Sequence, residues 1–232
     1  MALFAAATTG QPLGAQTVEQ ASVLLLQHEE VRKELGMTAG QRSAVDSAYK
    51  KHAASAQALF KQKPKTDAER KALQQKLLRS QTDFSNRCLE ILNAAQRSRL
   101  RQLGLQFFGP FTMLSAEISK ELGLSEPQKK KIRAAQDTLN KQAAQLQSKR
   151  LAELRAVPQP KDPNDAKAVA AYQKKLQQIA QSHQAADARA MDAAKKQAEA
   201  SLMAALTAAQ RTKWAGMIGK KFTIRGKPAS SA

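Results

Sequence analysis

The side chains best suited to chemistry in this chain are three histidines and one cysteine. His28, His52 and His183 fall in three different predicted helices, and Cys88 falls in a fourth. None of them has the His-x-x-x-His or Cys-x-x-Cys spacing that brings two metal ligands to one site. No glycine-rich phosphate loop follows a strand, because no segment reads as a strand. The sequence therefore predicts no catalytic residue, no metal site and no bound cofactor.

The surroundings of these residues favour structural roles. His183 and Cys88 occupy apolar seam positions of their helices, where a partly buried histidine and a small buried thiol are more common than a ligand or a nucleophile. His28 is followed by Glu29 and Glu30, which offers an alternative reading as a metal site. Because no second histidine lies nearby in the sequence, that alternative is the weaker one.

A five-residue phrase occurs four times and marks where helices begin. It consists of an apolar residue, then Ser, Thr or Asn, two variable residues and Gln. The Ser, Thr or Asn side chain accepts a hydrogen bond from the first helical turn, and the Gln can bond back to the N–H of the cap residue. Each phrase is thus a predicted capping box with a structural role. The residues concerned are Thr38 and Gln41, Asn93 and Gln96, Ser125 and Gln128, and Thr207 and Gln210.

The composition favours long helices with narrow apolar seams. Aromatic residues make up only 4% of the chain, whereas alanine, glutamine, lysine and leucine are abundant. The formal net charge of +19 favours an acidic or polyanionic partner. No apolar run is long enough to span a bilayer, and a single cysteine rules out an intrachain disulfide framework.

Caps, apolar periodicity and breaker residues together predict an all-α fold. Two further capping boxes, at Thr17 and Thr66, open a first helix and the return helix of a hairpin. A glycine-rich joint is predicted at 104–111, directly after a short helix. The predicted helices cover 17–35, 38–62, 66–91, 93–103, 126–155, 164–205 and 207–218.

The chain also contains an internal repeat, because residues 31–38 match residues 118–125 at an offset of 87 residues. This repeat predicts two tandem units of long antiparallel helical hairpins with short flanking helices, in an elongated or curved molecule. The chain is expected to act as a monomer of two pseudo-repeats or as a homodimer. The predicted division is a disordered tail or signal-peptide remnant at 1–16, a first unit at 17–104, a second unit at 105–219 and a basic disordered tail at 220–232.

The N-terminal residues leave two interpretations open. A short apolar run at 2–7, followed by small residues before Gln16, is similar to the end of a secretory signal peptide. It lacks a positive n-region, so the signal peptide would be incomplete in this sequence. The other interpretation is a disordered tail.

The four phrases, together with the helical spans that join them over most of residues 20–218, resemble the Spy/CpxP group of bacterial periplasmic proteins with LTxxQ motifs. The resemblance implies an all-α, ATP-independent periplasmic chaperone, or an accessory regulator of envelope-stress signalling, that works as a curved dimer. Family members typically carry one pair of phrases and this chain carries two, so one chain could supply what two subunits supply there. The implied location is the periplasm or the exterior of a bacterial cell envelope.

Two functional hypotheses follow from the charge and the helices. The first is a chaperone that holds unfolded or misfolded clients on basic helical faces, without an energy source. The second is a basic protein that binds anionic envelope polymers or has a structural role there; an accessory role beside a stress sensor is a third. Scarce aromatics and the lack of a recognised module argue against sequence-specific nucleic acid binding. The candidate partner-binding residues, which could instead merely solvate their helices, are Arg42, Lys50, Lys51, Lys61, Lys129, Lys130, Arg133 and Lys141.

Overall fold

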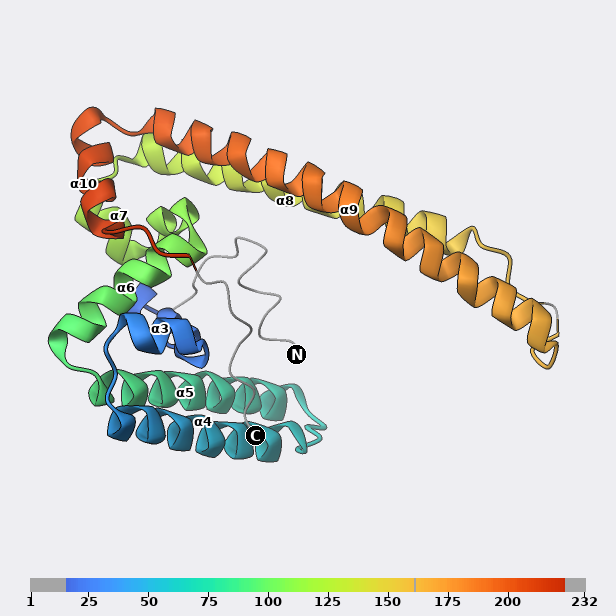
Figure 1. The fold of residues 1–232 in the computed structure, drawn as a ribbon, viewed down its shortest axis with the longest axis horizontal. Coiled ribbons are helices and arrows are strands. Elements are labelled where there is room, and N and C mark those ends of the chain that lie inside the picture. The colour runs from blue at the N-terminus through green and yellow to red at the C-terminus, as the bar shows by residue number, and fades with distance from the viewer. Residues whose placement is uncertain (1–15, 161, 224–232) are drawn as a thin grey trace. The chain divides into compact units, whose positions relative to one another are not determined.

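The computed structural model describes residues 16–160 and 162–223 (Figure 1). Within these ranges every regular element is a helix, so the all-α prediction is confirmed. The chain divides into two compact units, of which the described parts are residues 16–122 with 212–223, here called the N-terminal unit, and residues 123–211, here called the arm unit. None of the described helices has the length and apolarity that a bilayer span requires.

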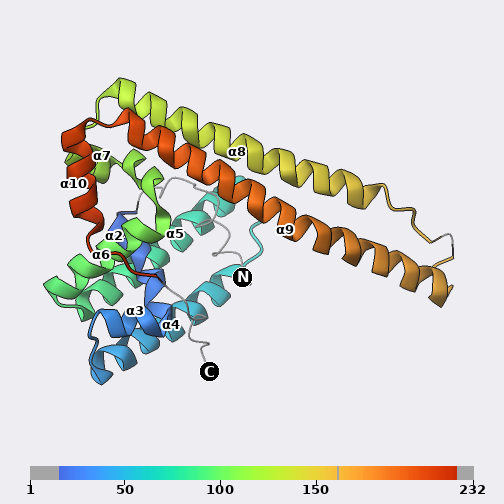
Figure 2. The same ribbon diagram turned by 45° about the horizontal axis from the view of Figure 1, so that its top comes forward.

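The N-terminal unit is built on two long helices that lie side by side, with shorter helices packed near one end of the pair (Figures 1 and 2). The long helices are α4 and α5, joined by the turn at 61–66. Capping boxes predicted at Thr17, Thr38, Thr66 and Asn93 are present. The elements are α2 (Val18–Ser22), η1 (Val23–Gln27), α3 (Glu29–Glu34), α4 (Ala39–Phe60), α5 (Asp67–Ile91), α6 (Ala94–Phe108), η2 (Pro110–Leu114), α7 (Ala116–Leu122) and the last turns of α10 (Ala208–Ile218).

The first predicted helix, 17–35, is broken at His28, and the prediction of one continuous helix is wrong. His28 has an extended backbone with φ −92° and ψ 123°. The buried guanidinium of Arg32 donates from Nε to the Leu26 carbonyl at 2.5 Å and from a terminal nitrogen to Asp46 at 2.5 Å. Arg32 therefore satisfies a carbonyl at the end of η1 that a continuous helix would have bonded internally.

The predicted joint at 104–111 is also placed differently in the structure. α6 continues through Gly104 to Phe108, and the chain turns at Gly109, where φ is +75°. Gly104 is needed because α2 crosses α6 at this point. A Cβ atom on residue 104 would lie 1.7 Å from Oγ and 2.8 Å from Cβ of Ser22. The glycine therefore permits a close helix contact and does not end the helix.

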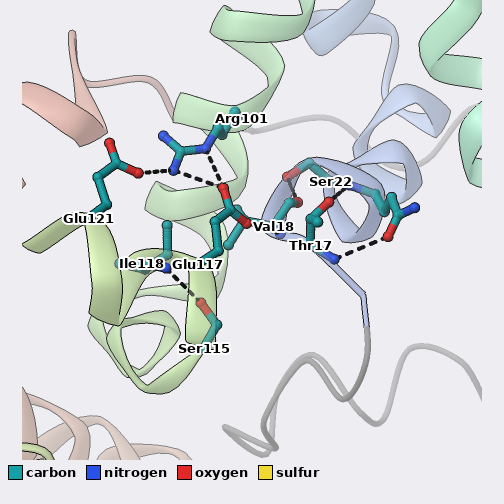
Figure 3. A network of polar contacts seen from close by, with 9 residues as sticks. Thr17, Val18, Ser22, Arg101, Ser115, Glu117, Ile118 and Glu121 are labelled. Carbon is teal, nitrogen blue, oxygen red and sulfur yellow. Dashed lines mark hydrogen bonds and ion pairs between the residues drawn. The ribbon is translucent and has the colours of Figure 1, made fainter.

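Residues 105–122, which the sequence placed in the second unit, pack within the N-terminal unit (Figure 3). Arg101 of α6 donates to Glu117 at 3.0 Å and to Glu121 at 2.5 Å, and both carboxylates belong to α7. The other oxygen of Glu117 accepts from the Val18 N–H at 3.3 Å, so one carboxylate joins the start of α2 to α6. These non-local contacts explain why the observed unit extends past the predicted boundary at 104.

The start of the predicted basic tail is ordered against the same unit. The Gln106 side chain donates to the carbonyls of Ile218 and Lys220, at 2.6 and 2.8 Å, and accepts from the Phe222 N–H at 2.8 Å. The Phe222 ring packs on the apolar core. The prediction of disorder from 220 onward is therefore wrong for 220–223. The rest of that tail and the predicted N-terminal tail or leader lie outside the described residues, apart from Gln16.

The arm unit consists of α8 (Glu126–Arg155), α9 (Ala166–Ala205) and the first turn of α10. α8 and α9 lie side by side along their length and are joined by a turn whose described residues are 156–160 and 162–165 (Figures 1 and 2). Ile132 and Leu202 are fully buried near the base of the pair. Beyond Leu139, most apolar seam residues are only half-buried. The arrangement of the two units in an elongated or curved molecule stays a prediction.

Candidate functional site

The glutamines of the first two phrases form a reciprocal pair in the N-terminal unit. Gln41 Nε2 donates to Gln96 Oε1 at 2.8 Å, and Gln96 Nε2 donates back to Gln41 Oε1 at 3.1 Å. Each Nε2 also donates to a carbonyl, that of Ile91 for Gln41 and that of Leu35 for Gln96. Each Oε1 accepts the N–H of its own cap residue at 3.0 Å. We call this arrangement of two capping boxes a glutamine clasp.

The arm unit contains a second glutamine clasp with the same connections. Gln128 Nε2 donates to Gln210 Oε1 at 2.7 Å, and Gln210 Nε2 donates back at 3.2 Å. Gln128 Nε2 also donates to the Ala205 carbonyl, and Gln210 Nε2 also donates to the Gly123 carbonyl. Both glutamine oxygens again accept from their own cap residues, at 3.0 and 2.9 Å. In the N-terminal unit the clasp joins the start of α4 to the start of α6. In the arm unit it joins the start of α8 to the start of α10.

The clasps leave little for a ligand to bind. A glutamine amide has two donor hydrogens and two acceptor lone pairs, and each clasp glutamine uses all four within the chain. Sequence reasoning predicted the capping boxes but missed the pairing of their glutamines. The signal was present in the order of the phrases, since each unit contains one phrase before its long helices and one after them.

Cys88 and His52 lie in positions that favour a structural role over a catalytic or metal-binding one. Cys88 is fully buried, and burial raises the pKa of its thiol to about 12, so it stays protonated at neutral pH and is a poor nucleophile. His52 stacks on Phe84 with ring centroids 4.4 Å apart, and burial lowers its pKa. The described residues contain no group of three or more His, Cys, Asp or Glu arranged to hold a metal ion.

The two remaining histidines, His183 and His28, lie in different surroundings. His183 is 12% exposed, and its ring nitrogens lie 2.6 Å from Glu153 and 3.7 Å from Asp187, so it links α8 and α9. The proposed alternative of a metal site at His28 loses a ligand, because Glu29 pairs with Arg42. His183 is therefore explained by pairing inside its own unit, whereas the buried Nδ1 of His28 has no hydrogen-bond partner among the described residues.

The candidate partner-binding cations fall into two groups: those that pair with a carboxylate of the chain and those that are exposed. Arg42 pairs with Glu29 and donates to the Met37 carbonyl at 3.1 Å, and Lys129 pairs with Glu126 at 2.8 Å. Arg42 is occupied by a carboxylate of α3 and Lys129 by one of its own helix, so both are poor candidates for a partner. The exposed cations are Lys50, Lys51 and Lys61 at α4, and Lys130, Arg133 and Lys141 on α8.

Three of the exposed cations of α8 form a stripe that faces away from α9. Lys130, Arg133 and Lys141 lie at spacings of three and eight residues, which places them on one helical face. The buried residues Ile132 and Leu139 lie on the opposite face, which packs on α9. The stripe makes no ion pair with another residue that the structure describes. We refer to it as the outer cation stripe.

Two apolar grooves open along the α8–α9 seam. The first, called the middle groove, has a volume of about 250 Å³. The second, called the tip groove, lies near the turn and has a volume of about 350 Å³. The middle groove is lined by Leu139, Asn140, Ala143, Leu146, Gln147, Arg150, Asp187 and Met191. The tip groove is lined by Leu151, Leu154, Arg155, Val157, Gln159, Tyr172 and Leu176.

The arm therefore combines a cation stripe on one face with apolar grooves along its seam. Neither feature resembles an enclosed small-molecule pocket, because both are open and extended along helices. Such surfaces suit extended polymers, which make many weak contacts. Comparisons with protein-family models, with curated proteins and with solved structures found no match to this chain.

Proposed function

We propose that this protein is an ATP-independent, chaperone-like binder of unfolded polypeptides, and that the α8–α9 pair provides its principal binding surface. The observation that carries the proposal is the half-exposed apolar seam of this pair. Among the described residues of the arm unit, no third helix runs along the seam to cover it. Leu146, Tyr172 and Ile179 are half-buried there, whereas seam residues near the base are fully buried.

Charge and apolar contact would act at different stages of binding. α8 carries eight Lys or Arg against three Asp or Glu, and α9 carries six against three. This excess attracts acidic chains over roughly 10 Å at moderate salt. The grooves then offer apolar area worth about 25 cal/mol per Å² buried, divided among many small contacts. Weak, replaceable contacts of this kind hold a client and release it without an energy source.

The location and oligomeric state are part of the proposal. The likeness of the four phrases to the Spy/CpxP group supports a bacterial cell envelope location. Two glutamine clasps in one chain support a molecule in which two pseudo-repeats replace two subunits. An accessory role beside an envelope-stress sensor would use the same surfaces.

The second candidate function is binding of anionic envelope polymers, and the outer cation stripe favours it. Lys130, Arg133 and Lys141 are exposed, share one face and point away from the apolar seam. A polyanion would therefore contact this face without using the grooves. Its affinity would fall steeply with salt, because each phosphate or sulfate contact releases counterions.

Client aggregation at two salt concentrations distinguishes the two functions. The full chain is mixed with an acidic client that has been unfolded by reduction of its disulfides, and light scattering is followed. We expect suppression to persist at about 0.15 M salt, because apolar contacts are not screened. The triple variant with Lys130, Arg133 and Lys141 changed to Gln should bind heparin more weakly but keep suppression at this salt concentration.

If the wild-type protein does not suppress aggregation at physiological salt but still binds heparin, the chaperone proposal is contradicted and the polyanion alternative is favoured. Melting of each variant by circular dichroism provides the folding control. The three changed residues are exposed, so their replacement should alter the unfolding free energy by no more than about 0.5 kcal/mol each.

A further inference from the structure

The tip groove is built from three segments that meet at the turn of the arm. Leu151 and Leu154 come from the last turns of α8, Val157 from the turn, and Tyr172 and Leu176 from the first turns of α9. The spacing of three or four residues within each helix places these side chains on one face. The floor of the groove is thus apolar, with a volume of about 350 Å³, which accommodates a large side chain.

Arg155 supplies the charge of this groove. Among the described residues that line it, Arg155 alone is charged. It lies in the last turn of α8, and it forms no ion pair with a residue that the structure describes. Arg155 is exposed, so a partner carboxylate can reach its guanidinium and bind it with two parallel hydrogen bonds beside the apolar wall of the groove.

Leu151 marks the apolar side of the same groove. It is 41% exposed, whereas the other leucines of α8 are half-buried or buried. Covering such a side chain removes apolar area from water, which favours a partner that brings an apolar side chain of its own. Leu151 and Arg155 are four residues apart on one helical face, so a single partner segment can contact both.

We infer that the tip groove binds a polypeptide segment that carries a large apolar side chain beside a carboxylate. The apolar side chain enters the groove between Leu151 and Tyr172, and the carboxylate pairs with Arg155. This inference rests on the proposed function and states which client segments the arm prefers. A second copy of this chain fits less well, because the excess of Lys and Arg on α8 and α9 makes two arms repel each other.

Binding of labelled peptides to the full chain tests the inference. The probes are three fluorescein-labelled 12-residue peptides that alternate Leu with Glu, Leu with Lys, or Ser with Glu. In fluorescence anisotropy the Leu/Glu peptide should bind most tightly. We expect Arg155→Gln to weaken it about fivefold, and Leu151→Gln to weaken it about tenfold.

Two matched variants control for charge and for apolarity. Lys149→Gln removes from the same helix an exposed cation that lines neither groove, and Leu78→Gln removes an exposed leucine from α5. Each control should change the affinity less than twofold. Both leucines are exposed, 41% and 62%, so their replacement should leave the fold intact.

Several results would overturn the inference. Equal weakening by Lys149→Gln and Arg155→Gln would show a general charge effect. Tighter binding of the Leu/Lys or Ser/Glu peptide would contradict the stated chemistry. A concentration-dependent dimer in sedimentation velocity that Leu151→Gln abolishes would identify a second copy as the occupant.

The aggregation assay on the same samples separates this inference from the proposed function. If wild-type protein suppresses aggregation and the two groove variants suppress it equally well, the function stands and the inference fails. If wild-type protein does not suppress aggregation but peptide binding depends on the groove, the proposed function fails and the groove assignment stands.

Discussion

Gln96→Ala is expected to lower the free energy of unfolding of the N-terminal unit by about 3 kcal/mol. Gln96 is only 7% exposed and connects Gln41, the Leu35 carbonyl and its own cap residue. Alanine removes these bonds and leaves a buried carbonyl without its partner. Unfolding in urea can be followed by the fluorescence of Trp214, which is buried in the same unit.

The exposed Gln57 of α4 provides the matched control for this prediction. Gln57→Ala should change the unfolding free energy by less than about 0.5 kcal/mol. A double variant, with Gln41 and Gln96 both changed to Ala, should be less destabilised than the sum of the single variants by roughly 1 kcal/mol, since both single changes break the same reciprocal pair. A Gln96→Ala variant as stable as wild type would show that the clasp does not hold this unit together.

Gly104→Ala should lower the unfolding free energy by about 2 kcal/mol, against the usual preference for alanine within helices. The added Cβ would lie 1.7 Å from Oγ and 2.8 Å from Cβ of Ser22, so α2 and α6 would have to separate. The contact with the Ser22 Cβ cannot be relieved by rotating the hydroxyl. The measurement is the same urea titration.

Two variants test the steric origin of this effect. Gly216 of α10 has open space at the position of a Cβ, so Gly216→Ala should stabilise the protein by up to about 1 kcal/mol. Ser22→Gly removes both close atoms, so it should restore much of the stability lost in Gly104→Ala. If neither Gly104→Ala nor Gly216→Ala lowered the unfolding free energy, α2 and α6 would not cross as closely as described.

The local features of this fold were predictable from the sequence, because they depend on neighbouring residues. Cap residues such as Thr38 and Asn93 bond within their own first turn, so a five-residue phrase contains the whole interaction. The lengths of α8 and α9 likewise follow from caps, periodic apolar residues and the proline-containing turn between them.

The non-local features were not predictable from the same patterns. Glycine at 104 looks like a helix end until Ser22 is known to pack against it. The break at His28 depends on Arg32 reaching back to Leu26, and the order at Phe222 depends on Gln106. Each of these contacts joins residues whose proximity is decided by the tertiary fold.

The candidate binding residues were likewise predictable from the sequence only in part. Composition alone indicated basic helical faces, but it could not show that Arg42 is occupied by Glu29. Nor could it show that Leu151 and Arg155 share a groove with Tyr172, because that depends on the register of α8 against α9. The surface that supports the proposed function therefore depends on how α8 packs against α9, which the sequence patterns do not determine.

The central claim is that the phrases build the fold while the α8–α9 seam binds unfolded chains. Its most direct test is photo-crosslinking from the full chain to an unfolded acidic client at about 0.15 M salt. A photoreactive side chain is placed at Leu151 or Gln147 in the grooves, or at the exposed phrase residues Ala95 and Ala209. We predict adducts from the groove positions and few or none from the phrase positions. Adducts from the phrase positions alone would contradict the account.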